Sequence, residues 1–489
     1  MASEIRRTHH KVTFVVLTAS VSAYALLQSL VTPVLPTIQE SLHTTQNTVT
    51  WVLTAYLLSA SIFTPIMGRI GDVIGKERVF VATLAALAAG SLLAALATNV
   101  TVMIIARAIQ GVGGGVLPLA FGIIRDEFPR EKISGAVGAI ASLVAVGGGV
   151  GIVLAGPIVN VLNYHWLFWL PMIVIVISGV AAAMFIPKSP VRTPGKISWQ
   201  PAVLLSGWLV ALLVALSQAP VWGWGSGRVL GLLAAAVVLA VGWIEVERRA
   251  ASPLIDMKMM RLPAVWTNNL VALLFGIGMY SVFAFLPEFL QTPKSTGYGF
   301  GLSVTHSGLV LLPMSIMMFL VGMRATSFAA RIGGKTVVVI GSLIGTLSMV
   351  LLAFAHTSTW ELYLATSIMG VGFGLAFAAM SSLIVAAVPP AQTGVASGMN
   401  ANIRTIGGSI GAALMSSVVT ASPAADGLPK ESGYTNGFAM LGIALLIGAF
   451  AAALIPVTKN RTQVAATDQM EHAELAMVPG GTVVGDGSE

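Results

Sequence analysis

The chain has 489 residues, of which 56% are hydrophobic and only 9% are charged, whereas a soluble domain carries about 25% charged residues. A surface this poor in charge is suited to lipid, and it argues against a soluble enzyme, a nucleic-acid-binding protein or a disordered scaffold. The formal net charge of +7 does not change this, because the basic residues lie in short loops between apolar runs and form no single patch.

Fourteen apolar runs follow one another along the chain, each suited to cross a bilayer as a helix of about 20 residues. In order they occupy residues 12–36, 48–67, 78–97, 101–124, 134–158, 165–186, 201–218, 228–246, 264–290, 303–323, 336–355, 360–387, 394–420 and 435–456. The first run is too long for a cleaved signal peptide, and thirteen more follow it. The predicted fold class is therefore an all-α membrane protein with 14 spans.

Lys and Arg fall mainly on one side of this series of spans. When alternate loops are assigned to opposite sides, 21 of the 26 basic residues share a side with both termini. Three lie on the other side (Arg228, Lys294 and Lys430), and Arg107 and Arg404 fall inside spans. The positive-inside rule then predicts a multi-pass protein of a bacterial cell membrane with both termini in the cytoplasm.

An internal repeat relates the two ends of the chain. MIIARAIQGVGGG, which starts at Met103, matches LYLATSIMGVGFG, which starts at Leu362, at an offset of 259 residues. Parallel repeats of this kind are typical of transporters that move around a site at the membrane midplane. A duplicated channel or structural protein is the alternative, but it has less need for so many glycines on helix faces.

The repeat predicts two six-helix bundles with two additional transmembrane helices inserted between them. The expected units are a cytoplasmic N-terminus at 1–11, the bundles at 12–186 and 264–456, the inserted helices with their linkers at 187–263, and a disordered cytoplasmic tail at 457–489.

Three motifs resemble those of the major facilitator superfamily. The segment GRIGDVIGKER from Gly68 to Arg78 resembles its signature loop, G-x-x-x-D-x-x-G-[RK]-x-[RK]. The fourth span, with Arg107, Gln110 and Gly111, is similar to its second motif. The fifth span is similar to the glycine-proline motif of its antiporters and carries Gly147, Gly151, Gly156 and Pro157. With 14 spans, residues 10–456 resemble the drug:proton antiporter subfamily.

The resemblance implies that the signature loop is a latch that holds the outward-facing state. Its residues are Gly68, Arg69, Gly71, Asp72, Gly75, Lys76 and Arg78. We expect its glycines to permit a tight turn. Asp72 should lie within reach of Arg69 and Lys76, near the N-terminal end of the third span, where a carboxylate is favoured. The alternative is a solvated turn whose ion pairs contribute little.

Arg107 is a charge inside an apolar span, which costs at least about 2.5 kcal/mol on insertion scales. The resemblance implies a role in proton coupling, together with Gln110, through a neighbouring acid. The alternative is a buried arginine that holds the bundle together through helix carbonyls. The glycines of the fifth span are expected to let helices approach closely, although Asn160 and Val161 stand where the antiporters have two further glycines.

The acid expected for proton coupling is missing from the first span, because Leu27 stands where the subfamily commonly has aspartate. Glu288, at the outer end of the ninth span, is the acid closest to the membrane interior. It is either a titrating group that faces a cavity or a hydrated residue at the rim. Asp72 is the other candidate.

A soft, apolar cavity is expected between the bundles, because Met and aromatic surfaces repack around varied ligands. Met stripes are more often ordinary helix packing. Arg404, with its neighbours Asn400 and Asn402, either lines the C-terminal half of the cavity or contacts the cytoplasmic gate. The alternative is an interfacial arginine that extends into water. The candidate lining residues are Tyr24, Gln28, Trp51, Tyr56, Met279, Tyr280, Phe283, Met314, Met318, Phe377, Asn400, Asn402 and Arg404.

The predicted function is export of amphipathic drug- or antibiotic-like compounds, neutral or cationic, by alternating access in exchange for protons. The alternative is a transporter or facilitator of lipid-like metabolites without obligatory proton coupling. No enzyme activity, cofactor, metal or nucleic-acid partner is expected, since the chain lacks cysteine and no metal-ligand cluster or catalytic motif stands out. The expected partners are the substrate, protons and the lipid bilayer, and we expect a monomer.

Overall fold

The computed structural model describes residues 10–44, 46–189, 199–250, 253, 255–389, 392–421 and 428–456. The predicted cytoplasmic N-terminus, apart from its last two residues, and the predicted disordered tail at 457–489 lie outside these residues. The helices are α1 His10–Leu30, η1 Thr32–Val34, α2 Leu35–Ser41, α3 Gln46–Ile74, α4 Lys76–Ala95, α5 Val100–Gln110, η2 Gly111–Gly115, α6 Val116–Glu127, α7 Arg130–Val161, α8 Trp166–Phe185, α9 Trp199–Trp222, α10 Gly227–Arg249, α11 Met257–Met260, α12 Pro263–Gln291, η3 Lys294–Thr296, α13 Val304–Ile332, α14 Gly334–Phe354, α15 Thr359–Ala387, α16 Thr393–Thr420 and α17 Glu431–Ala453.

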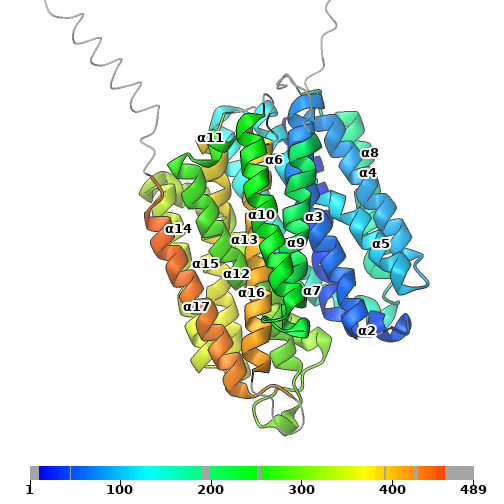
Figure 1. Ribbon diagram of the computed structural model, residues 1–489. Coiled ribbons are helices and arrows are strands. Elements are labelled where there is room, and N and C mark those ends of the chain that lie inside the picture. Colours follow the sequence, from blue (N-terminus) through cyan, green and yellow to red (C-terminus); the bar gives the residue numbers. More distant parts are fainter. Residues whose placement is uncertain are drawn as a thin grey trace, which may run out of the picture. The chain divides into compact units, whose positions relative to one another are not determined.

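Fourteen helical stretches among the described residues are long and apolar enough to cross a membrane, so the predicted class and the predicted number of spans are confirmed. They run side by side in Figure 1. The orientation of the termini and the residue limits of the predicted units stay predictions.

The fourth span is less regular than the sequence indicates. It consists of α5, the 3₁₀ segment η2 and α6 in succession. Four of the five η2 residues are glycines, and they lie against neighbouring helices: a Cβ on Gly113 would meet the Leu87 side chain of α4, and a Cβ on Gly114 would meet Thr64 of α3. The glycines therefore bring this span close to α3 and α4 and tighten its backbone.

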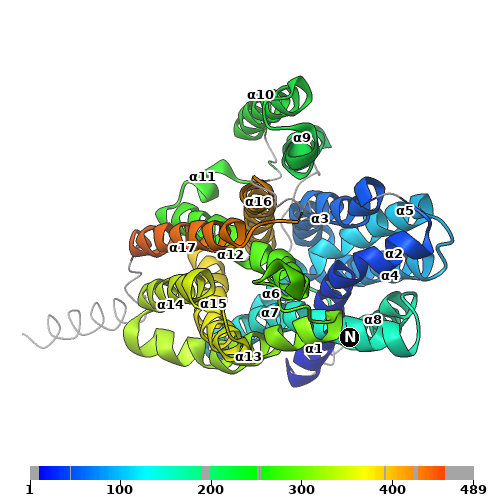
Figure 2. The same cartoon turned by 90° about the horizontal axis from the view of Figure 1, so that it is seen from below.

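Within the compact unit that ends at Ile455, the helices form two groups. Figure 2 looks along them, with α12–α17 gathered on one side and α1–α8 on the other, while α9 and α10 lie at the margin beside α3 and α16. Thr54 of α3 and Ser217 of α9 are hydrogen-bonded at 3.1 Å, and the Trp224 indole donates to Ser417 of α16 at 2.7 Å. The additional pair is thus attached where the two groups meet.

Two buried apolar clusters follow this division. One joins residues of α1–α9 to Trp243 of α10, to residues between Ile255 and Val265, and to parts of α15 and α16 between Phe377 and Ile406. The other is built almost entirely from α12–α17. Many side chains outside these clusters are large, apolar and exposed, such as Val238 and Phe450, as expected of surfaces that face lipid.

One end of the unit carries most of the basic residues. There α3, α6, α13 and α15 finish, and α4, α7, α14 and α16 begin. We call it the basic end, because Arg69, Lys76, Arg125 and Arg331 lie there. The positive-inside prediction places this end in the cytoplasm.

Candidate functional site: a cavity between the two helix groups

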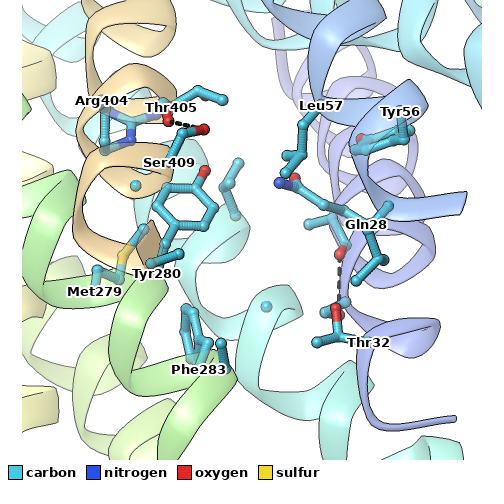
Figure 3. Close-up of a pocket in the computed structure, with 18 of the residues that line it drawn as sticks. Gln28, Thr32, Tyr56, Leu57, Met279, Tyr280, Phe283, Arg404, Thr405 and Ser409 are labelled. Carbon is cyan, nitrogen blue, oxygen red and sulfur yellow. Dashed lines mark hydrogen bonds between the residues drawn. The ribbon is translucent and has the colours of Figure 1, made fainter. Parts of the chain in front are cut away.

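A cavity of about 230 Å³ lies between the two groups of helices. Figure 3 shows its two facing walls, with Tyr56 and Leu57 on one side and Arg404 and Thr405 on the other. The walls come from α1 and α3 and from α12 and α16, and α7 closes the space behind them. Its lining residues are Ala25, Gln28, Ser29, Thr32, Leu53, Tyr56, Leu57, Arg107, Val144, Gly148, Ile152, Met279, Tyr280, Phe283, Ala284, Phe377, Arg404, Thr405, Gly408, Ser409 and Ala412.

Some of the predicted lining residues meet in this cavity and others do not. Seven line it: Gln28, Tyr56, Met279, Tyr280, Phe283, Phe377 and Arg404. Six do not: Tyr24, Trp51, Met314, Met318, Asn400 and Asn402. The functional roles of all thirteen stay predictions.

Met314 and Met318 are fully buried in α13. A Cβ on Gly370 or Gly374 of α15 would strike their backbones, so these methionines mark a helix–helix seam. Asn400 donates to Asn269 of α12 at 2.9 Å. The two methionines and Asn400 therefore take part in packing within the second helix group.

The sequence reasoning missed the small and hydroxyl residues of the lining. Gly148 lies in the glycine run of α7, and Thr405, Gly408 and Ser409 follow Arg404 along α16. Small residues on a helix face leave room between helices, so these glycine runs were the available signal.

Arg107 is completely buried at the cavity wall. Its Nε donates to the Val52 carbonyl of α3 at 3.1 Å, and Nη1 donates to the Gln110 amide oxygen at 2.8 Å. Its guanidinium lies 4.2 Å from the centre of the Tyr56 ring. Among the described residues, Nη2 has no hydrogen-bond partner. No acid is among the contacts of Arg107, so the geometry resembles the structural alternative more than the tuning of a neighbouring acid.

Arg404 is a buried cation that the second helix group contributes to the cavity, and it is 6% exposed. Its guanidinium lies 4.4 Å from the centre of the Phe377 ring, within hydrogen-bonding reach of the Tyr280 hydroxyl. Its Nε has no partner among the described residues. Arg404 therefore lies at the cavity, and its low exposure argues against a side chain that extends into water.

The turn expected within Gly68–Arg78 is much shorter than predicted. α3 stays helical through Gly68 and Gly71 to Ile74, and only Gly75, with φ of +127°, reverses the chain. A Cβ on Gly68 would lie 2.8 Å from the Gly394 carbonyl oxygen of α16. The first glycine of the motif thus serves close approach between helices, which sequence spacing alone does not distinguish from a turn.

Asp72 lies in the last turn of α3 and is 1% exposed. The Lys76 ammonium lies 3.6 Å from Oδ1 of Asp72 and 2.8 Å from Oδ2 of Asp126. Arg69 is also buried. Arg78 is exposed, and its ion pair with Glu77 is long at 3.9 Å. The buried group of charges is therefore centred on Lys76, and the solvated-turn alternative does not describe it.

A helix N-terminus that the sequence did not predict also lies beside Asp72. A Cβ on Gly394, in the first turn of α16, would lie 3.3 Å from Oδ1 of Asp72. Helix N-termini favour negative charge. Asp72 therefore links α3 to α16 across the seam between the two helix groups.

Further contacts close this seam at the basic end. The Arg125 guanidinium of α6 donates to the Val385 carbonyl of α15, and a Cβ on Gly398 would meet the backbone of Thr64 and Pro65. Farther along, α3 and α16 separate and become facing walls of the cavity. The two helices touch at the basic end and part around the cavity.

The glycine-proline motif of α7 packs against both helix groups. A Cβ on Gly147 would meet Ala25 of α1, and a Cβ on Gly156 would meet Thr305 of α13. Ser29 of α1 sits against Gly151 and donates to the Gly147 carbonyl at 2.8 Å. Pro157 lies within the helix. Close approach occurs along α7, as the sequence suggested.

Glu288 does not line the cavity. Its side chain is exposed, and its Oε1 accepts a hydrogen bond from the Tyr434 hydroxyl of α17 at 3.1 Å. This position agrees with the rim alternative. Its role in proton coupling stays a prediction.

The sequence of this chain is similar to those of known proteins. The family model described as Major Facilitator Superfamily matches residues 17–412 and 270–476. "Multidrug transporter protein MdtP" of Bacillus subtilis (strain 168) is 32% identical over 385 residues, which cover 76% of this chain and 68% of that protein. The "Tetracenomycin C resistance and export protein" of Streptomyces glaucescens is 28% identical, covering 87% and 78%. "Cephamycin export protein CmcT" of Amycolatopsis lactamdurans is 29% identical, covering 88% of each chain.

One solved structure is similar in fold. The crystal structure titled human organic anion transporter MFSD10 (TETRAN) matches with a TM-score of 0.64 over 90% of this chain and 99% of that chain. The two sequences are 17% identical, so this likeness concerns the fold alone.

Proposed function

This chain belongs to the major facilitator superfamily, and on that premise we propose that it exports amphipathic drug- or antibiotic-like compounds across a cell membrane in exchange for protons. Relatives named for multidrug transport and for antibiotic export support export of such compounds over the lipid-metabolite alternative.

The single observation that carries the proposal is the cavity between the two helix groups. It is large enough for part of an organic molecule, and its lining is mostly apolar, with Leu53, Ile152 and Phe283 among the side chains. Sites for small organic molecules are typically apolar with a few placed polar groups. Gln28, Tyr280 and Thr405 supply such groups here.

The way α3 and α16 meet supports a mechanism of alternating access. In this conformation their contact at Gly68 and Gly394 separates the cavity from the basic end. Opening that end requires these helices to part, which breaks the approach of Asp72 to the first turn of α16. A rigid-body rotation of one helix group against the other accomplishes this, as in other domain movements.

Proton coupling is proposed to act through Asp72. Its carboxylate is buried at the seam, and neither oxygen has a hydrogen-bond donor among the described residues. A proton there removes the attraction of the carboxylate for Lys76 and for the N-terminus of α16. Lys76 keeps its shorter ion pair with Asp126. Protonation of Asp72 therefore weakens the seam selectively and favours opening at the basic end.

Dye efflux tests this proposal directly. Cells without their own exporters, with and without this protein, are loaded with a panel of cationic, neutral and anionic dyes. Expression is expected to lower retention of at least one dye severalfold, and an uncoupler should restore it. Efflux that the uncoupler leaves unchanged would contradict the proton-coupling part. Unchanged retention of every dye in cells that contain the folded protein would contradict export.

A further inference from the structure

The charged residues that line the cavity are all positive, which the sequence did not lead us to expect. Arg107 from one helix group and Arg404 from the other both line it, whereas no Asp or Glu is among its lining residues. The expectation from sequence was a preference for neutral or cationic compounds. A cationic ligand would find two positive charges here and no described carboxylate to receive it.

Among the residues that the structure describes, no acid forms an ion pair with either guanidinium. Arg107 is held by a carbonyl, an amide oxygen and the face of Tyr56, all of which are uncharged. Arg404 lies on the Phe377 ring and near the Tyr280 hydroxyl, which are uncharged partners as well. In each guanidinium one nitrogen, Nη2 of Arg107 and Nε of Arg404, also has no hydrogen-bond acceptor among the described residues.

No acid of the helices around the cavity is among its lining residues, and three of these acids have partners elsewhere. Asp72 of α3 and Asp126 of α6 share the Lys76 ammonium at the basic end. Glu288 of α12 accepts from Tyr434 of α17. A buried charge without a partner is costly, and two of them in one small apolar cavity form an arrangement that an anion stabilises.

We propose that the cavity selects organic anions, whose acidic group binds at Arg107 and Arg404 and whose apolar body packs on residues such as Leu57 and Phe283. Guanidinium groups suit this role because their N–H groups match carboxylate geometry and stay charged when buried. The inference rests on the proposed export function, since it names the class of compound that the cavity takes.

Two dyes with the same ring system test the charge preference. Fluorescein carries a carboxylate, and rhodamine 123 carries a methyl ester at that position and is cationic. Binding to the purified full-length protein in phosphatidylcholine nanodiscs is measured by fluorescence anisotropy. The wild-type protein is expected to bind fluorescein at least about tenfold more tightly, the size of one hydrogen-bonded charge contact. Equal affinities, or tighter binding of rhodamine 123, would overturn the proposal without any variant.

Arg404 variants locate the effect. Arg404→Gln is expected to weaken fluorescein binding about tenfold and to leave or improve rhodamine 123 binding, whereas Arg404→Lys should retain much of the fluorescein affinity. Arg331→Gln is the matched control, because it removes an exposed arginine from α13 far along the chain from the lining residues. Equal weakening of both dyes by Arg404→Gln would assign Arg404 to packing and overturn the proposal.

Transport of the same dyes in proteoliposomes separates this inference from the export function. Rhodamine 123 transport without fluorescein binding would overturn the anion preference and leave export standing. Fluorescein binding without transport of either dye would contradict export and leave the anion site standing. Absence of both binding and transport would overturn both.

Discussion

The two repeated halves of this transporter share a framework of glycines but differ in charge. At the offset of 259 residues Arg107 of α5 corresponds to Thr366 of α15. Each reaches the neighbouring helix of its own half: Nε of Arg107 donates to the Val52 carbonyl at 3.1 Å, and the Thr366 hydroxyl lies 2.9 Å from the Val310 carbonyl. The same helix–helix link is thus made once with a cation and once without.

The basic end shows the same difference. Asp72 corresponds in the repeat to Arg331, and Asp126 corresponds to Val385. The first half buries a carboxylate–ammonium group there, whereas Arg331 is exposed. Because the glycine framework recurs and the charges do not, packing sets the common shape. The charges distinguish the first half, and in the proposed function they are the groups that respond to a proton.

Replacement of Asp72 by Asn should break this asymmetry with the largest effect. Asn keeps the shape of the side chain but removes the charge that draws α3 to Lys76 and to the first turn of α16. Lys76 retains Asp126, so the protein should still fold. We expect dye efflux to fall by at least about tenfold at equal protein level in the membrane.

The repeat supplies the control for Asp72→Asn. Arg331→Gln changes the corresponding position of the second half, where no buried ion pair is formed, and efflux should change less than about twofold. Equal losses in the two variants would mean that both loops need a charge, and the comparison between the halves would fail.

The spans and the repeat could be predicted from the sequence, because a bilayer demands long apolar helices and a duplication preserves the spacing between matching residues. It also identified Arg107 and Arg404, since a charge in an apolar run needs a special environment, and it identified Asp72 through the resemblance of its segment to a family motif. Which partner each charge meets was not predictable. Asp72 lies beside the N-terminus of α16, which is over 300 residues away in the sequence.

The sequence does not show which way a residue on a helix faces. This explains why some of the predicted lining residues lie outside the cavity. Met314 and Met318 lie where the backbone of α13 meets α15, whereas Met279 lines the cavity. Gly68 looked like a turn residue and is a contact residue. Only the packing of helices around each position separates these cases.

Paired substitutions in the glycine framework sharpen the comparison, with a smaller effect. A Cβ on Gly370 would strike the Met314 backbone, and a Cβ on its repeat partner Gly111 would meet Ser59 and the backbone of Ala60. Overpacking of this kind costs about 1–3 kcal/mol. Gly370→Ala and Gly111→Ala should therefore both lower the thermal unfolding temperature of the detergent-solubilised protein.

Gly231→Ala on α10 serves as the reference for these two variants, because a Cβ there meets no atom within 4 Å. It should leave the unfolding temperature unchanged or raise it slightly, since Ala favours a helix by about 1 kcal/mol over Gly. If Gly370→Ala behaved like Gly231→Ala while Gly111→Ala did not, the framework would be shared in sequence but not in energy.

Thr366→Val is expected to have the smallest effect and tests whether the uncharged link is dispensable. The hydroxyl has one proton and lies 2.9 Å from both the Val310 and the Leu362 carbonyl, so it is not committed to the neighbouring helix. Val keeps the shape and removes at most one hydrogen bond, which contributes about 1 kcal/mol. The unfolding temperature should fall slightly, and Thr366→Ser should restore part of the loss. Because no charge is involved, dye efflux per folded molecule should stay at the wild-type level, and a large loss of efflux would show that the second half also carries a coupling group.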